Sequence, residues 1–152
     1  MPTKVLSLQH VQQQEDGECL AACADMILRY IGKSIAYNRL VSLLQVKRGL
    51  GARSSNIHFL KRLDVTVLYT QGSLDSIRAH LQNGNPCIAF VLTGELPYWS
   101  YSVQHALVVV GMDEEKVWIH DPEFEQAPIA ISIGDFDLAW LEMDMMFAVI
   151  AL

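Results

Sequence analysis

The positions of apolar and polar residues in the first part of the chain predict helices. Between residues 17 and 31, apolar side chains recur at intervals of three and four, which is the spacing of one helix face. Asp16 is expected to cap the N-terminus of this helix, and Gly32 is expected to end it. Two further helices are expected at residues 37–44 and 54–63.

Further along the chain, short apolar and β-branched runs have the length of β-strands. A helix at residues 73–82 stands among them, capped by Ser73 and ended by Asn83 and Gly84. The remaining expected elements are an extended segment at residues 5–12, strands at 65–69, 86–92, 105–112, 117–121, 129–133 and from 147, and a short helix at 135–141. Helices that come first and strands that follow are typical of an α+β fold, and the length suits a single domain over residues 1–152.

Composition and charge exclude several classes of protein. A net charge of -6 disfavours a nucleic acid as partner, because such binding depends on lysine and arginine neutralising phosphates. No apolar run approaches the roughly 20 residues that a membrane span needs, and the N-terminus lacks the apolar region of a signal peptide. We therefore expect no membrane span, and a protein that is cytoplasmic or faces the cytosol.

The chain contains three cysteines, an odd number in a sequence without a secretion signal. Free thiols are therefore expected rather than a disulfide framework. Cys19 and Cys23 have no nearby histidine that would complete a zinc pattern. Neither a metal nor a cofactor is expected.

Cys19 falls in the first turn of the first predicted helix, where unpaired N–H groups and the helix dipole favour an anion. Such a position lowers the pKa of a thiol, and the thiolate is the nucleophilic form of cysteine. Glu15, Asp16 and Glu18 act in the opposite direction, because nearby carboxylates disfavour a second negative charge. A nucleophilic Cys19 therefore needs an imidazole partner.

The candidates for that partner are the five histidines of the chain, His10, His58, His80, His105 and His120. His58 and His80 lie in predicted helices among polar neighbours, as solvated surface residues do. His105 and His120 flank one predicted hairpin, in which His105 opens the first strand and Asp121 closes the second. His105 is therefore the candidate base, and Asp121 is the candidate carboxylate that orients it.

The turn of this hairpin decides whether His105 and Asp121 meet. A three-residue turn places His105 opposite Asp121 on one sheet face, with Cβ atoms about 4.5–5.5 Å apart. In that register Val109 pairs with Val117. An even-numbered turn puts Asp121 on the other face and brings His120 beside His105. The sequence leaves the turn length open.

The same residues also have structural interpretations. A free cysteine is often buried in the core, and this interpretation is favoured for Cys23 and Cys87, which lie in apolar surroundings. His105 is open to interpretation as a structural histidine, and Asp121 as a turn residue. The aromatic loop at residues 93–101 either lines a cleft beside the histidine or packs on the core.

Several motifs, taken in order, resemble a known family. Gln13 stands six residues before Cys19, and a helix of small residues follows that ends near Tyr30 and Gly32. Then come a buried strand, a strand that opens with histidine, an Asp-Pro step and a Phe and Trp pair, at residues 84–89, 105–111, 121–122 and 136–140. This ordered set resembles the C39 peptidase family, the papain-like domains at the N-terminus of bacteriocin and peptide exporters.

The resemblance implies a papain-like fold, with the cysteine in an N-terminal helical half and the histidine and aspartate on a C-terminal antiparallel sheet. The residues that it implies as nucleophile, base, orienting group and oxyanion-hole donor are Cys19, His105, Asp121 and Gln13. The family's Asp-Cys-Gly step is replaced here by Glu18-Cys19-Leu20. Gln12 and Gln14 flank Gln13, so an alignment shifted by one residue is an alternative at that position.

The activity implied by the resemblance is that of a cysteine endopeptidase that works through an acyl-enzyme and cleaves after small residues or a double glycine. Its partners are then a peptide or protein substrate and a peptide exporter. Leu20, in place of glycine, is expected to narrow the cleft and to favour glycine before the cleaved bond. Two alternatives stay open: a catalytically silent module that holds an export substrate, and a papain-like acyl transferase or transpeptidase.

Overall fold

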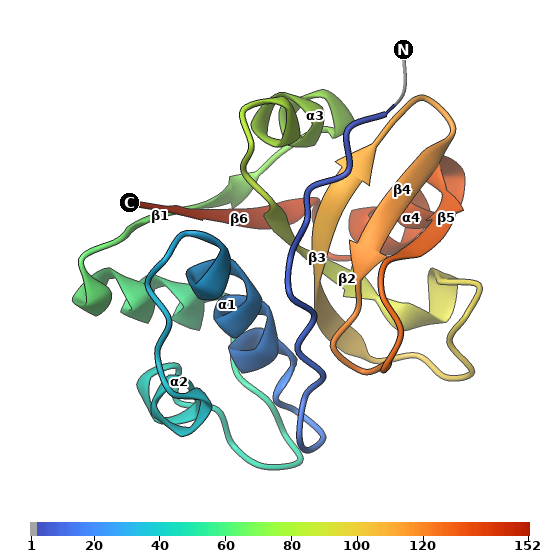
Figure 1. Cartoon of the computed structure of the whole chain (residues 1–152). Coiled ribbons are helices and arrows are strands. Elements are labelled where there is room, and N and C mark those ends of the chain that lie inside the picture. The colour runs from blue at the N-terminus through green and yellow to red at the C-terminus, as the bar shows by residue number, and fades with distance from the viewer. Residues whose placement is uncertain (1–2) are drawn as a thin grey trace.

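A six-stranded antiparallel sheet forms the centre of the computed structural model, which describes residues 3–152. The strands follow the order β1-β6-β2-β3-β4-β5 across the sheet (Figure 1). Their bounds are β1 (Thr66–Gln71), β2 (Cys87–Leu92), β3 (Gln104–Met112), β4 (Lys116–His120), β5 (Ile129–Ser132) and β6 (Met146–Ala151). The sheet thus takes most of its strands from the second half of the chain.

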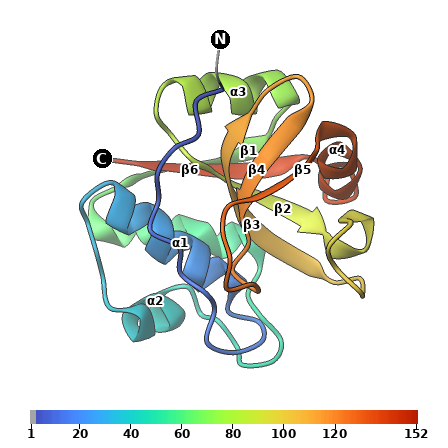
Figure 2. The same ribbon diagram turned by 45° about the vertical axis from the view of Figure 1, so that its right-hand side comes forward.

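Helices pack on both sides of this sheet. They are α1 (Cys19–Tyr30), α2 (Tyr37–Leu43), α3 (Leu74–Gln82) and α4 (Ile133–Leu141), with 3₁₀-helices η1 (Ser54–Leu63) and η2 (Thr93–Glu95). Figure 2 shows α1 and α2 on one side of the sheet and α4 on the other. The α+β class predicted from the sequence is confirmed.

One detail of the predicted helices is wrong. Helix α1 begins at Cys19, with Glu18 at the N-cap position and no side-chain capping bond, so Asp16 is not its cap. The helix predicted at residues 54–63 is present with these bounds, as a 3₁₀-helix. Its apolar positions Ile57, Leu60 and Leu63 are three residues apart, a spacing that matches the three residues per turn of a 3₁₀-helix.

Helix α1 is enclosed on nearly all of its faces. All residues from Leu20 to Leu28 are buried, among them three alanines that let neighbouring elements approach closely. Asp25 is 1% exposed and is paired with Arg29 through a 2.9 Å bond between Oδ1 and Nε. Because α1 also packs against β3, its N-terminal residue is held at a fixed place beside the sheet.

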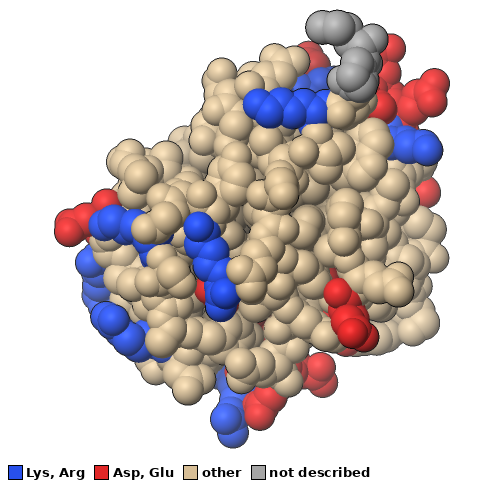
Figure 3. All heavy atoms as spheres, in the orientation of Figure 1, with Lys and Arg blue, Asp and Glu red and all other residues tan. Residues whose placement is uncertain are grey.

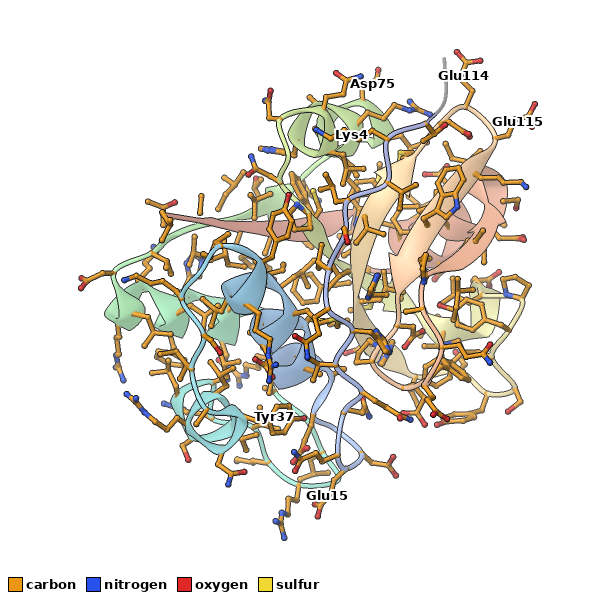
Figure 4. The ribbon with its side chains drawn as sticks, in the orientation of Figure 1. Lys4, Glu15, Tyr37, Asp75, Glu114 and Glu115 are labelled. Atoms are coloured by element: carbon orange, nitrogen blue, oxygen red, sulfur yellow. The ribbon has the colours of Figure 1, made fainter. Side chains whose placement is uncertain are left out.

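The β3–β4 hairpin has an even-numbered turn, the second of the two possibilities that the sequence left open. Met112 pairs with Val117, and Glu114 and Glu115 lie at the tip (Figure 4). Asp113 stabilises this turn, because its Oδ1 accepts the backbone N–H groups of Glu115 at 2.8 Å and Lys116 at 2.7 Å. The pairing of Val109 with Val117, which a three-residue turn would give, is therefore not formed.

A β-bulge then corrects the register. Val109 pairs with Ile119 and Gly111 with Trp118, so Val110 is an extra residue in β3. Such an insertion exchanges the two faces of the strand beyond it. Continuing the Val109–Ile119 register places Asp121 on the same face as His105, one pair along rather than directly opposite.

The N-terminal segment lies along this hairpin (Figure 1). The carbonyl of the bulged Val110 accepts the N–H of Leu6 at 2.8 Å. Gly111 leaves room for the crossing, since a Cβ there would lie 3.0 Å from a methyl group of Val5. The bulge is thereby fixed by the segment that leads on to Gln13 and Cys19.

Charged side chains of both signs are scattered around a mainly uncharged centre on the face in Figure 3. Within residues 3–152, no helix is long and apolar enough to span a bilayer.

Candidate active site

Cys19 is partly exposed at the N-terminal end of α1. Burial raises the pKa of its thiol, but the hydrogen bond and charge of His105 and the N–H groups of Ala106 and Leu20 lower it. The pKa ends below its ordinary value of 9.0. The thiolate is therefore favoured at this position.

The carboxylate that precedes Cys19 is engaged in structural hydrogen bonds. Glu18 is 5% exposed, and its Oε1 accepts the hydroxyl of Tyr37 at 2.9 Å and the N–H of Glu15 at 3.1 Å. Figure 4 shows Tyr37 extending from α2 toward the loop that carries Glu15. Glu18 thus ties α2 to the start of α1.

His105 lies between Cys19 and Asp121 and is 7% exposed. Its Nε2–H donates to Oδ1 of Asp121 at 2.7 Å, which leaves Nδ1 for the hydrogen bond with Cys19. Burial lowers the pKa of His105, but the bonds to Asp121 and Cys19 and the charges of both raise it above the ordinary value of 6.5. Together, the two shifted pKa values favour a thiolate–imidazolium pair.

Asp121 is fully buried and accepts four hydrogen bonds. Oδ1 accepts from His105 and from the N–H of Glu123 at 3.0 Å. Oδ2 accepts from the hydroxyl of Tyr98 at 2.7 Å and from Nε1 of Trp99 at 2.9 Å. Burial raises the pKa of Asp121, yet the bond and charge of His105 and the other donors lower it below its ordinary value, so the group stays a carboxylate.

The aromatic loop before β3 supplies two of these donors, which sequence reasoning missed. Trp99 also stands edge-on to the imidazole of His105, with ring centroids 4.8 Å apart. The signal was available, because buried tyrosine and tryptophan need partners for their polar atoms and an acid at a strand end is one. Trp99 and Tyr101 line a hollow at the site, so the loop both packs against Asp121 and faces the cleft.

Gln13 reaches the site from the N-terminal segment. Its Nε2 donates to Oε2 of Glu123 at 3.0 Å and, at 3.3 Å, to the carbonyl of Glu15. Of the three successive glutamines, Gln13 lines the hollow that also contains Cys19. The exposed Gln12 donates instead to the carbonyl of Glu123.

Two hollows meet at the Cys19–His105 pair. The first has a volume of about 250 Å³ and contains Gln13, Trp99 and Glu123. The second has a volume of about 90 Å³ and is lined on one side by Leu20, Ala52, Arg53, Phe90 and Met143. A larger hollow of about 510 Å³ lies between α2 and η1, but its lining includes neither the thiol nor the imidazole. The two smaller hollows, which contain Cys19 and His105, are therefore the candidate substrate-binding hollows.

The other cysteines and histidines have different surroundings. Cys23 and Cys87 are completely buried, as predicted, and burial raises the pKa of Cys87 to about 12. His120 faces His10, with 3.2 Å between their Nδ1 atoms, and His105 is the histidine that meets Asp121. No group of three potential metal ligands occurs within residues 3–152.

Comparison with protein families and solved structures places this site in a known context. A model of the Peptidase C39 family matches residues 7–149. The chain belongs to this family. No curated protein matches its sequence at a significant level.

The solved structures that resemble this C39 protein share its fold at low sequence identity. A protein of Bacillus anthracis described as a C39-like peptidase has a TM-score of 0.82 at 17% identity, over 100% of this chain and 98% of its own. A double glycine motif protease from an AMS/PCAT transporter, solved with the leader peptide, gives 0.77 at 16%, over 99% of both chains. The peptidase domain of Streptococcus ComA gives 0.77 at 17%, over 94% of this chain and 97% of its own. The predicted papain-like peptidase fold is therefore confirmed.

Proposed function

We propose that this C39 protein is a cysteine endopeptidase in which Cys19 is the nucleophile and His105 the general base. One observation carries the proposal. Cys19 and His105 line the same two hollows, Nε2 of His105 is held by Oδ1 of Asp121 at 2.7 Å, and Gln13 lines one of these hollows. A nucleophile, a base, an orienting group and an oxyanion donor are the parts that acyl transfer by a thiol requires.

In the first half of the reaction, the thiolate of Cys19 attacks the carbonyl carbon of the peptide bond. The carbonyl electron pair moves onto oxygen and gives a tetrahedral oxyanion. When it collapses, the C–N bond breaks and the imidazolium of His105 gives its Nδ1 proton to the leaving amine. The products are a free amine and a thioester on Cys19.

In the second half, neutral His105 takes a proton from water as the water oxygen attacks the thioester carbonyl. Collapse of this second tetrahedral species breaks the C–S bond and releases the carboxylic acid. Asp121 keeps its negative charge throughout, stabilises the imidazolium and fixes the ring with Nδ1 toward sulfur.

Gln13 and the backbone of Cys19 are the proposed donors to the oxyanion. The N–H of Cys19 belongs to the first turn of α1, where backbone N–H groups have no carbonyl of the same helix to bind. Gln13 lines the hollow that also contains Cys19. Loss of one such donor slows turnover by roughly 100- to 1,000-fold.

The proposed substrate is an extended peptide cleaved after a small residue, with glycine before the cleaved bond and a double-glycine leader as the natural form. Leu20 is 3% exposed and lines the 90 Å³ hollow beside Cys19, which leaves little volume for a side chain there. One structural relative is a double glycine motif protease solved with its leader peptide, which supports the same substrate class. A peptide exporter is the partner that such a substrate implies.

The test is cleavage of a peptide library, with Cys19→Ala as the blank and mass spectrometry of the products. Cysteine-dependent cleavage with glycine at the acyl position is expected. If a large residue is preferred there, the glycine proposal is wrong, whereas binding without cleavage would support the silent module. Products joined to an added amine, in place of free acids, would support the acyl transferase.

A further inference from the structure

The turn that follows β4 binds both Asp121 and Gln13, the two residues that flank the reacting pair from opposite sides. The N–H of Glu123 donates to Oδ1 of Asp121 at 3.0 Å, and the carboxylate of Glu123 accepts Nε2 of Gln13 at 3.0 Å. The carbonyl of Pro122 accepts the backbone N–H of Gln13 at 2.7 Å. One short segment therefore links the proposed orienting group to the proposed oxyanion donor.

We propose that Glu123 is a positioning residue, whose carboxylate holds the side-chain amide of Gln13 with its nitrogen toward the catalytic hollow. This inference rests on the endopeptidase function proposed above. It assigns a role to a residue outside the triad and gives Gln13 its orientation.

The side-chain amide of Gln13 has two ends of different chemistry, an N–H donor and an oxygen acceptor. The nitrogen and oxygen of a glutamine side chain have nearly the same shape, so packing alone does not choose between the two orientations related by a flip. An ionised carboxylate accepts hydrogen bonds and donates none. Glu123 therefore selects the orientation in which Nε2 faces it, and only that orientation supplies N–H groups.

The two hydrogens of Nε2 differ in how firmly they are bound. The one toward Glu123 makes a charge-assisted bond of 3.0 Å, the stronger kind. The one toward the carbonyl of Glu15 spans 3.3 Å, a longer and weaker bond to a neutral acceptor. When an oxyanion forms nearby, the second hydrogen is the one that can be given up to it, while the first keeps the amide in place.

The oxygen of this amide supports the same orientation. Gln13 Oε1 is buried and has no hydrogen-bond partner among the described residues. Leaving a buried acceptor unpaired costs roughly 1–3 kcal/mol, so another interaction has to hold the amide in this orientation. The bond to Glu123 is the charge-assisted contact that does so.

Kinetics of Glu123→Ala and Glu123→Gln test the role. Glu123→Ala should lower kcat about tenfold with little change in KM, which is less than loss of the donor itself. Glu123→Gln keeps an acceptor oxygen but loses the charge and adds N–H donors, so it should recover only part of that loss. Because the bond from residue 123 to Asp121 uses the backbone, the rate at which iodoacetamide labels Cys19 should stay unchanged in both variants. Glu125→Ala removes a charge from an exposed position two residues on and should leave kcat unchanged.

A double-mutant cycle separates positioning from a general structural effect. In a Gln13→Ala background, Glu123→Ala should have no further effect on kcat, since the group it orients is gone. An equal fall in both backgrounds, or an unchanged kcat in the parent background, would overturn the proposal.

Side-chain amide NMR provides a readout that needs no turnover. With the Gln13 resonances assigned from the Gln13→Ala variant, the amide hydrogen bonded to Glu123 should exchange with water about tenfold faster in Glu123→Ala. Unchanged exchange would overturn the Glu123–Gln13 link itself. A parent protein with no Cys19-dependent cleavage would overturn the endopeptidase function and with it the catalytic role of Glu123, while the exchange rates would still decide whether Glu123 holds the amide.

Discussion

The two ends of the Cys19–His105–Asp121 series have very different surroundings. Asp121 is fully buried, and four donors from a loop, a strand and a turn saturate its carboxylate. Cys19 is partly exposed, and its sulfur is bound by His105 and two backbone N–H groups at the edge of two hollows. The site is thus rigid where it only orients and open where a bond has to form.

This contrast has a physical reason. A group that holds an imidazole in one tautomer and orientation works better when it has no alternative partner. A nucleophile that is equally enclosed could not reach a peptide carbonyl. Substitutions at the two ends should therefore have different effects. A substitution of Cys19 should remove catalytic activity alone, whereas a substitution of Asp121 should lower both activity and stability.

Replacing Cys19 should have the largest effect on activity and a small effect on stability. Cys19→Ala is expected to abolish turnover, because no other residue at the hollow supplies a thiolate, while the melting temperature should change little at this partly exposed position. Peptide mapping after brief treatment with iodoacetamide should find Cys19 labelled before Cys23 and Cys87. Faster labelling of either buried cysteine would contradict the assignment.

Asp121→Asn should have the next largest effect and should lower stability as well. Turnover is expected to fall by about 100-fold or more, because the amide no longer favours the imidazole tautomer with its proton on Nε2. An NH₂ group in a pocket built of donors also leaves at least one buried donor unpaired, at a cost of roughly 1–3 kcal/mol. Steady-state kinetics and urea unfolding measure the two effects, and a variant as stable as the parent would show that the four donors do not define the pocket.

The same contrast explains which parts of the molecule could be predicted from the sequence. The Cys19 end depends on local features, a helix start and a spacing of six residues from Gln13, and both are visible along the chain. The Asp121 end depends on register. The pairing of His105 with Asp121 was predicted, and the structure has the two side chains hydrogen-bonded, but from the sequence this pairing required a three-residue turn.

The structure reaches that result through an even turn and a bulge at Val110. Val110 itself does not mark the bulge, since valine is an ordinary strand residue, and the neighbouring Gly111 is the one local sign of it. What fixes it is the N-terminal segment, whose Leu6 binds the carbonyl of Val110 from more than a hundred residues away in the chain. The roles of Tyr98 and Trp99 were hidden for the same reason, because their partner Asp121 lies in another element.

The pH dependence of kcat/KM should report the contribution of Asp121 to the charge of His105, with a smaller effect than the substitutions above. The active form is the thiolate–imidazolium pair, which exists above the pKa of Cys19 and below that of His105. Because the pKa of Cys19 is lowered from 9.0 and that of His105 is raised to about 10, kcat/KM should rise at a pH below 9.0 and fall near pH 10. In Asp121→Asn the carboxylate that raises the pKa of His105 is gone, so the alkaline limb should move down by about one pH unit. An alkaline limb that stays in place would show that Asp121 does not set the charge of His105.

The smallest expected effect concerns the open end of the site, where Leu20 borders the 90 Å³ hollow. Truncating a buried leucine costs roughly 2–5 kcal/mol of stability wherever it lies, so a change in specificity has to be separated from that loss. Leu28 offers a matched control, because it lies in the same helix, is completely buried and does not line either hollow at the site.

Leu20→Ala should enlarge the hollow and raise kcat/KM for alanine relative to glycine at the acyl position by about threefold. Space for one or two extra methylene groups in the hollow changes the selectivity between substrates only modestly, because neighbouring side chains can relax into that space. Leu28→Ala should lose a similar amount of stability in thermal unfolding and leave the alanine-to-glycine ratio unchanged. If both variants shift the ratio equally, the change reflects a loosened helix, and Leu20 does not set the size of the substrate. If only Leu20→Ala shifts it, the residue that replaces the family's glycine beside the nucleophile is what makes the open end of the site selective.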